Sequence, residues 1–334
     1  MKKIGNTYCF EDPPRVLSYA SVVGKKEGEG PLSRDFDYIS DDNTFGEQSW
    51  EKAESRMTSM ALERVLAKGS LTAAQLGCIL GGDLLNQCIS TTFALRPSNV
   101  PFFGLYGACS TMAEGLLLAA CLVDGEFEPT ACAITSSHFC SAERQYRYPL
   151  EYGGQRPQTA QWTATASGAV ILQKGGKGVK VTRATPGRIA DPGVTAQANM
   201  GAAMALSAYQ TLSRFFQDTK TCPTDYDLIV TGDLGRVGHQ IVIDLFQRDN
   251  VDIKPVYDDC GLMLYHGDQD VHAGGSGCGC SAAVLCSYLL KALEQKVLKK
   301  ALFCGTGALL SPTSANQGQS IPGICHLVCL EADN

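Results

Sequence analysis

Cys109 stands where an α/β protein places a nucleophile. It ends the apolar stretch FFGLYGAC, and a helical pattern of small and apolar residues follows it up to Gly125. The first turn of a helix carries unpaired backbone N–H groups and the positive end of the helix dipole, and both lower the pKa of a cysteine. The same N–H groups could hold an oxyanion or a ligand carboxylate. The pattern therefore predicts either a nucleophile or an anion site at Cys109.

A long insert supplies further groups for a ligand. Residues 137–166 are rich in Tyr, Arg and Gly and follow the apolar run ACAITSS. An irregular insert at the carboxyl end of a strand is where α/β folds place ligand sites. Arg144, Arg147 and Arg156 can each form bidentate contacts with a carboxylate, and the alternative is an ion pair with a glutamate of the same insert. Planar surface for a ligand ring is offered by Tyr146, Tyr148, Tyr152 and Trp162.

Three polar residues follow predicted strands directly. Ser137 and His138 come at the end of ACAITSS, and Asn86 follows the run GCILGGDLL. We expect all three at the mouth of the same pocket. His138 either donates to a ligand carboxylate or is a buried histidine bonded to the backbone.

The stretch AGGSG, residues 273–277, is dense in glycine and precedes a predicted helix. Without side chains, the backbone N–H groups of Gly274, Gly275 and Ser276 could grip an anion. A tight turn with positive φ explains the same glycines, and the two interpretations are compatible.

Four blocks recur in the same order along the chain. They pair GCILGGDLL with YDLIVTGDLG, GACS with GCGCS, ACAITSS with ALFCGTG, and SGAVILQ with GICHLVCLE. Cys109 in the second block thus corresponds to Cys280. We infer two copies of one unit, residues 1–175 and 176–334, with the pocket insert at about 137–166 in the first copy only.

The elements of each copy follow from hydrophobic periodicity. A long amphipathic helix precedes each Gly-Asp-Leu strand, SWEKAESRMTSMALERVLAKG in the first copy and NMGAAMALSAYQTLSRFF in the second. The strands lack polar alternation and helices lie between them, which predicts parallel sheets covered on both faces. Two such units form a five-layer α/β stack. We expect Asp83 and Asp233, at equivalent strand ends, to be helix N-caps or structural ligands across the pseudo-twofold axis.

Composition narrows the function further. The net charge of -6 argues against nucleic-acid binding. No apolar run reaches the roughly 18 residues that a transmembrane helix needs, and no signal peptide is expected. The 15 cysteines include no CxxC pair, so we expect free buried thiols, no zinc site and no cofactor. No EF-hand loop occurs, so we expect no calcium cage either.

The duplicated unit, the GACS turn and the late loop GTGALLSP resemble the thiolase superfamily over nearly the whole chain. The resemblance implies a thiolase-like duplicated α-β-α-β-α five-layer fold with pseudo-twofold related halves, and a homodimer through the edge of the first half. It also implies histidines on loops of the second half. The matching positions hold Gly232, Asp233 and Ser276 instead, while His239 and His272 are displaced. A cysteine without a base is a poor catalyst, so we expect a binding site, with Cys109 as a vestigial nucleophile position. The alternative is a superfamily acyltransferase that uses Cys109.

A closer resemblance rests on GDLLNQ, TSSH, AERQYRYPLEYGGQRP, DDCGLMLY and AGGSGCGCSA, which are similar to the stage V sporulation protein AD family. The resemblance implies binding of dipicolinic acid (pyridine-2,6-dicarboxylate), as the free acid or its calcium chelate, during its accumulation in the developing spore. It implies membrane-embedded SpoVA subunits as partners, and a peripheral, cytoplasmic position at the membrane around the spore and at the spore inner membrane. The expected ligand-binding residues are Cys109, Asn86, Ser137, His138, Arg144, Arg147, Gly274, Gly275 and Ser276.

Overall fold

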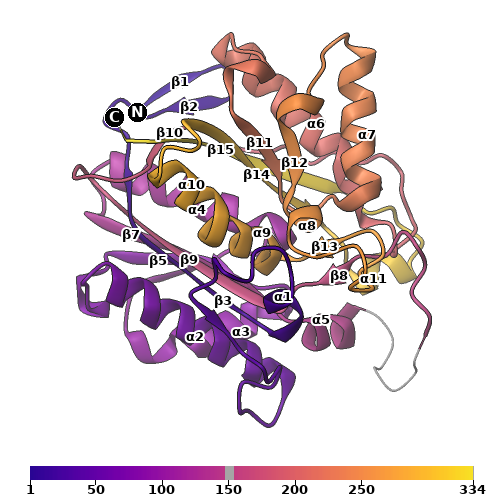
Figure 1. Cartoon of the computed structure of the whole chain (residues 1–334), viewed down its shortest axis with the longest axis horizontal. Helices are drawn as coiled ribbons and strands as arrows, with labels where there is room; N and C mark the ends of the chain where they lie inside the picture. The colour runs from indigo at the N-terminus through magenta and orange to yellow at the C-terminus, as the bar shows by residue number, and fades with distance from the viewer. Residues whose placement is uncertain (147–153, 334) are drawn as a thin grey trace.

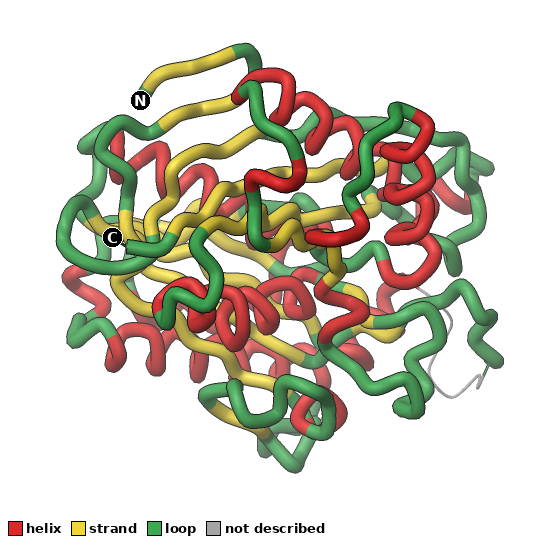
Figure 2. Tube along the Cα trace, turned by 45° about the horizontal axis from the view of Figure 1, so that its top comes forward, coloured by secondary structure: helices red, strands yellow, loops and turns green. Residues whose placement is uncertain are grey.

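Two sheet regions alternate with three layers of helices in the computed structural model, which describes residues 1–146 and 154–333 (Figure 1). In Figure 2 the strands run through the middle of the molecule and helices flank them. This arrangement confirms the predicted five-layer stack.

The strand order shows the duplication directly. One half has the order β6 (Phe102–Gly104), β5 (Cys78–Gly82), β7 (Thr130–Ser137), β9 (Ala166–Gln173) and β3 (Arg15–Val23). The other half has β12 (Tyr257–Asp259), β11 (Leu228–Thr231), β14 (Lys300–Ala308), β15 (Gly323–Glu331) and β10 (Lys180–Thr185). Three of the repeated sequence blocks thus fall on equivalent strands. The two halves meet where β3 pairs with β10, through Arg15 and Lys180.

The sheets are mixed, which corrects the expectation of parallel sheets. β5 runs parallel to β6 and β7, but β9 is antiparallel to both of its neighbours. The second half repeats this, with β15 antiparallel to β14 and β10. These strands are buried on both faces, so their sequences lack the alternation that usually marks antiparallel pairs.

Helices cover both faces of each sheet. The outer layers hold α2 (Trp50–Lys68) with α3 (Ile89–Leu95), and α6 (Met200–Thr219) with α7 (Gly235–Arg248). Between the sheets lie α4 (Thr111–Asp124) and α9 (Cys278–Val284), which continues through a π-helical turn into α10 (Leu290–Glu294). α4 packs on β7 of one half and on β15 of the other, so it belongs to the core that both halves share.

The predicted long helices form for the expected reasons. The side chain of Ser49 caps α2 by accepting from the backbone N–H of Lys52, and Met57, Ala61 and Val65 on one face are fully buried. The remaining elements are short: β1 (Lys2–Ile4), β2 (Thr7–Cys9), α1 (Lys25–Gly28), β4 (Tyr38–Ile39), α5 (Phe139–Tyr146), β8 (Trp162–Thr163), α8 (Cys260–Met263), β13 (Gly275–Ser276) and α11 (Pro312–Asn316).

The expected boundary after residue 175 falls in the loop between β9 and β10 and stays a prediction. Among the described residues, no helix has both the length and the apolar character needed to cross a bilayer.

Candidate functional site

Cys109 lies in a short 3₁₀ turn, Ala108–Ser110, that leads into α4. The preceding residue, Ala108, has a φ of 51°, a left-handed conformation that costs a residue with a Cβ on the order of 1 kcal/mol. Such strain is found mainly where the surrounding structure must hold one side chain in a fixed position. The thiol is buried, with 5% of the residue exposed.

The second half closes on this turn from β14. A Cβ placed on Gly307 would lie 2.6 Å from the carbonyl oxygen of Gly107, so only glycine fits there. The GTG sequence, which lies at the end of β14 and not in a loop, is therefore needed for close packing of the two halves around Cys109.

Asp233 is the charged partner of Cys109. Its buried carboxylate accepts from the Thr306 hydroxyl at 2.8 Å, the Ser276 hydroxyl at 3.1 Å and the Gly277 N–H at 2.9 Å, and it also interacts with the Cys109 thiol. The expected structural role of Asp233 is confirmed. Asp83 has an equivalent role, because it accepts from the backbone N–H groups of Leu85 and Thr91.

The electrostatics oppose a thiolate at Cys109. Burial raises the pKa of the thiol well above its ordinary value, and the charge of Asp233 raises it further. The expectation that the helix N-terminus lowers this pKa is therefore wrong, since burial beside a carboxylate outweighs the dipole.

The pocket insert begins as a helix, α5, and this helix covers the thiol. Leu84, Cys109, Ala142 and Cys278 form one apolar cluster, and Tyr146 at the end of α5 packs against it. The Tyr146 hydroxyl donates to the carbonyl of Leu84. A small dianion would meet an apolar cover and a buried carboxylate at this point.

The displaced histidines do not supply a base. His239 stacks on Tyr257, with ring centroids 4.6 Å apart, on the outer layer of the second half. His272 pairs with Asp270 at 3.0 Å, in a loop before β13. In the described part of the chain, no histidine has a recorded contact with Cys109.

Ser137, His138 and Asn86 are all bonded within the chain. The buried Ser137 hydroxyl donates to the Ala164 carbonyl at 2.7 Å. His138 is buried too; its ring bonds the Asn43 carbonyl at 2.8 Å, and burial lowers its pKa. Asn86 accepts from the Tyr106 hydroxyl at 3.2 Å. Ser137 and His138 would have to give up an existing bond to hold a ligand, whereas the bond of Asn86 uses only its side-chain oxygen and leaves its amide N–H donors to a ligand. The binding role of all three stays a prediction.

The described arginines of the insert contact different parts of the molecule. Arg144 pairs with Glu51 of α2, so it points to the outer helical layer and not toward Cys109. Arg147 lies outside the described residues. Arg156 instead reaches the loop before β13, where it donates to the carbonyl of Asp270 at 2.7 Å.

The glycine-dense loop is engaged in a strand pair. Gly275 and Ser276 form β13, which runs parallel to β8 of the insert. The N–H of Gly274, whose φ is 119°, donates to the Val271 carbonyl, and the N–H of Gly277 is taken by Asp233. The turn interpretation of these glycines is supported, and an anion nest remains untested.

The structure also brings together a group of residues that the sequence pattern did not connect. The indole of Trp162 is stacked on Phe139, with centroids 3.7 Å apart, and two cations lie over it: the Lys26 ammonium at 4.2 Å and the Arg156 guanidinium at 4.8 Å. The sequence analysis did not predict Lys26 as a site residue. Its position just after the apolar strand that ends at Val23 could have indicated it, because α/β folds place ligand sites at the carboxyl ends of strands.

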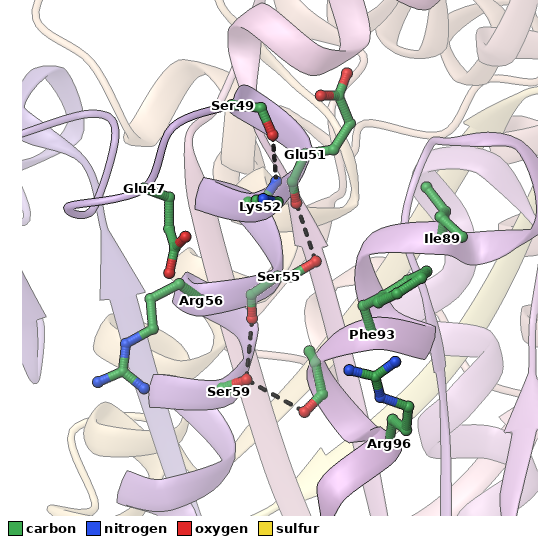
Figure 3. A pocket seen from close by; sticks show the side chains of 11 residues that line it. Glu47, Ser49, Glu51, Lys52, Ser55, Arg56, Ser59, Ile89, Phe93 and Arg96 are labelled. Atoms are coloured by element: carbon green, nitrogen blue, oxygen red, sulfur yellow. Dashed lines mark hydrogen bonds between the residues drawn. The ribbon is translucent and has the colours of Figure 1, made fainter.

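A cavity of about 510 Å³ lies between α2 and α3 on the outer layer (Figure 3). Phe93 and Ser55 face each other across it, and the guanidinium of Arg96 lies 5.1 Å from the Phe93 ring. Glu51, the partner of Arg144, also lines this cavity. Arg144 therefore belongs with this outer surface.

All 15 cysteines are free thiols. Within residues 1–146 and 154–333, no cluster of His, Cys, Asp and Glu could hold a metal ion.

Comparison with known sequences identifies the family. The sequence model of the stage V sporulation protein AD family matches residues 5–331. Stage V sporulation protein AD of Bacillus subtilis (strain 168) is 44% identical over 332 residues, which cover 99% of this chain and 98% of that protein.

Solved structures with a similar fold are enzymes of low sequence identity. The 3-oxoacyl-[acyl-carrier-protein] synthase III of Aquifex aeolicus VF5 has a TM-score of 0.54 at 12% identity and covers 94% of this chain and 99% of its own. Cerulenin-bound OleA of Xanthomonas campestris has a TM-score of 0.61 at 13% identity, covering 99% of this chain and 100% of its own. At these identities the likeness shows the fold alone, and it confirms the thiolase-like class.

Proposed function

The chain belongs to the stage V sporulation protein AD family, and we propose that it serves sporulation by binding dipicolinic acid and not by acyl transfer. The observation that carries the non-catalytic part is the pairing of Cys109 with Asp233. A carboxylate is a far weaker base than this thiolate, so it cannot hold the thiol proton away from sulfur. Its negative charge also disfavours the thiolate that attack requires.

The ligand itself comes from the family resemblance found in the sequence. Dipicolinate is small, planar and dianionic near neutral pH, so its site needs cationic or N–H donors and a flat wall. The side chains that border Cys109 are apolar or acidic. Its carboxylates therefore need donors elsewhere in the insert and the neighbouring loops.

Calorimetry tests this function. We expect the purified chain to bind dipicolinate and to bind isophthalate, which keeps both carboxylates but lacks the ring nitrogen, more weakly. Equal binding of both, or no binding of either, would remove dipicolinate recognition. A Cys109→Ala variant should keep its affinity, because the thiol is covered by α5.

One observation favours an acyltransferase as the alternative: the strained Ala108 still presents Cys109 at the start of α4. Incubation with labelled acyl-CoA and mass spectrometry of the Cys109 peptide separates the two functions. A thioester that forms and turns over would establish the enzyme, and an unmodified Cys109 supports the binding protein.

For the cellular setting, we propose a peripheral position at the membrane of the developing spore, with membrane-embedded SpoVA subunits as partners. The family membership supports this proposal. Co-purification with those subunits from spore membranes tests it, and recovery of the chain free of them after gentle extraction would argue against it.

A further inference from the structure

Two cations converge on one aromatic side chain beside the pocket insert. Lys26 comes from α1 and Arg156 from the insert, and both lie within 5 Å of the Trp162 indole centroid. Phe139 already stacks on this indole, so the cations share what is left of its surface. Figure 1 shows α1, α5 and β8 gathered in one region of the molecule.

The two cations are not fully neutralised. Within the described residues, the Lys26 ammonium has no hydrogen-bond or ion-pair partner, and Nη1 of Arg156 is buried without a partner. The acid in contact with the pair is Asp270, which bonds Nη2 of Arg156 at 3.2 Å and is also shared with His272. Asp270 is thus the acid bonded to the pair and is largely exposed; Glu27 and Glu29 also lie near Lys26 without bonding its ammonium, and an N–H donor of Arg156 is left over.

The cations are held in place by the backbone around them. Buried Glu27 fixes α1, because its carboxylate accepts from the Thr165 N–H at 3.0 Å and from the Tyr265 hydroxyl. The Lys26 carbonyl accepts from Gln269 at 2.7 Å. Gln269 and Asp270 are neighbours, so one loop positions both Lys26 and Arg156. This preorganisation lowers the entropy lost when a ligand binds.

Like charges at close range make the pair a receptor for an anion. Burial lowers the pKa of Lys26, the charge of Asp270 opposes this, and the charge of Arg156 lowers the pKa further, which shows that the two cations are close enough to interact. A carboxylate between the two cations would satisfy the free N–H of Arg156 and relieve this repulsion.

We propose that Lys26 and Arg156, positioned over Trp162, form an anion site that receives a carboxylate of the dicarboxylate ligand. This inference rests on the proposed function for the identity of the ligand. It separates the binding site from the Cys109 thiol. The neutral calcium chelate lacks the net charge that two cations attract, so the site selects the free dianion.

Titration calorimetry with dipicolinate, in EDTA, tests the site. Lys26→Met and Arg156→Gln should each weaken binding by about 10-fold or more, since each removes a charge-assisted contact. Two matched controls should bind as the wild type does: Lys25→Met, an exposed lysine of the same helix, and Arg64→Gln, another arginine stacked on an aromatic ring. Circular dichroism melts verify that each variant folds, and excess Ca²⁺ should weaken wild-type binding.

The outcomes separate the two proposals. A wild type that binds dipicolinate while both variants bind equally well would overturn the anion site and leave the function standing. A wild type that does not bind dipicolinate would overturn the function.

In that case Trp162 fluorescence tests the anion site independently of dipicolinate binding. The chain has 2 tryptophans, so a Trp50→Phe background leaves Trp162 as the single emitter. Inorganic phosphate should then change its emission, and Lys26→Met should abolish the change. No response to phosphate would overturn the anion site as well.

Discussion

Cys109 keeps the position of a nucleophile while its surroundings oppose the chemistry. The turn before α4 still holds it in a strained loop, but burial and Asp233 keep its proton on sulfur. The residues at the expected histidine positions form a hydrogen-bonded support, with Ser276 and Thr306 donating to one carboxylate. A support of this kind positions the loops of the second half, and its one acidic group, Asp233, is held by these hydrogen bonds.

The reactivity of single thiols tests this description. Iodoacetamide on the folded protein at pH 8 should modify the exposed Cys222 and leave Cys109 unmodified until the protein is unfolded, because attack requires the thiolate. Mass spectrometry of a time course measures both sites in one sample. Modification of Cys109 ahead of Cys222 would instead reveal an activated thiol.

At the scale of elements, a buried glutamate joins three parts of the first half. Glu54 of α2 accepts from Ser136 of β7 at 3.1 Å and from Ser141 of α5 at 2.6 Å. Burial, and then the charge of Asp83, raises the pKa of Glu54 to about 8. This carboxyl therefore tends to keep its proton near neutral pH, and its state affects the helix that covers Cys109.

Glu54→Gln should make the protein less sensitive to pH. A carboxyl whose folded pKa lies above its unfolded value is not penalised below pH 4.5, and it destabilises the fold increasingly as pH rises toward about 8. The variant should therefore match the wild type near pH 4 and exceed its stability at pH 8.5, by up to about 4 kcal/mol, because each unit of pKa shift is worth about 1.4 kcal/mol. Urea unfolding at both pH values measures this. The exposed Glu63→Gln on the same helix is the control, and an unchanged pH slope in Glu54→Gln would contradict the prediction.

At the scale of the whole molecule, the sheet of the first half ends at an uncovered edge. β6 is the last strand of the order, and Phe103 on it is 51% exposed. An edge strand offers unpaired N–H and C=O groups to another chain, and exposed apolar residues add to that tendency. We propose that two copies pair at this edge, the homodimer that the thiolase resemblance implies.

Phe103→Lys should shift the protein toward monomer, since a charge on an edge strand disfavours strand pairing. Sedimentation velocity at several concentrations measures the distribution. Phe127→Lys, at a residue that is 77% exposed beyond the end of α4, should leave the dimer intact. A wild type that stays monomeric throughout would end the dimer proposal.

The sequence by itself determined the architecture and the residues that stand at the family's histidine positions. Repeated blocks and apolar periods are local signals, so they identified both halves, α2 and α6, and the substitution of Asp233 and Ser276 for histidines. The antiparallel direction of β9 and β15 was not predicted, because a strand that is buried on both faces has the same apolar sequence pattern in a parallel and in an antiparallel sheet.

Only the tertiary structure decided the state of the site. The contact of Cys109 with Asp233, the cover formed by α5, and the meeting of Lys26 with Arg156 over Trp162 all join residues far apart in the chain. Spacing along a sequence carries no information about such contacts. The pKa of a thiol depends on its burial and on the charges packed beside it, and both exist only after the chain has folded.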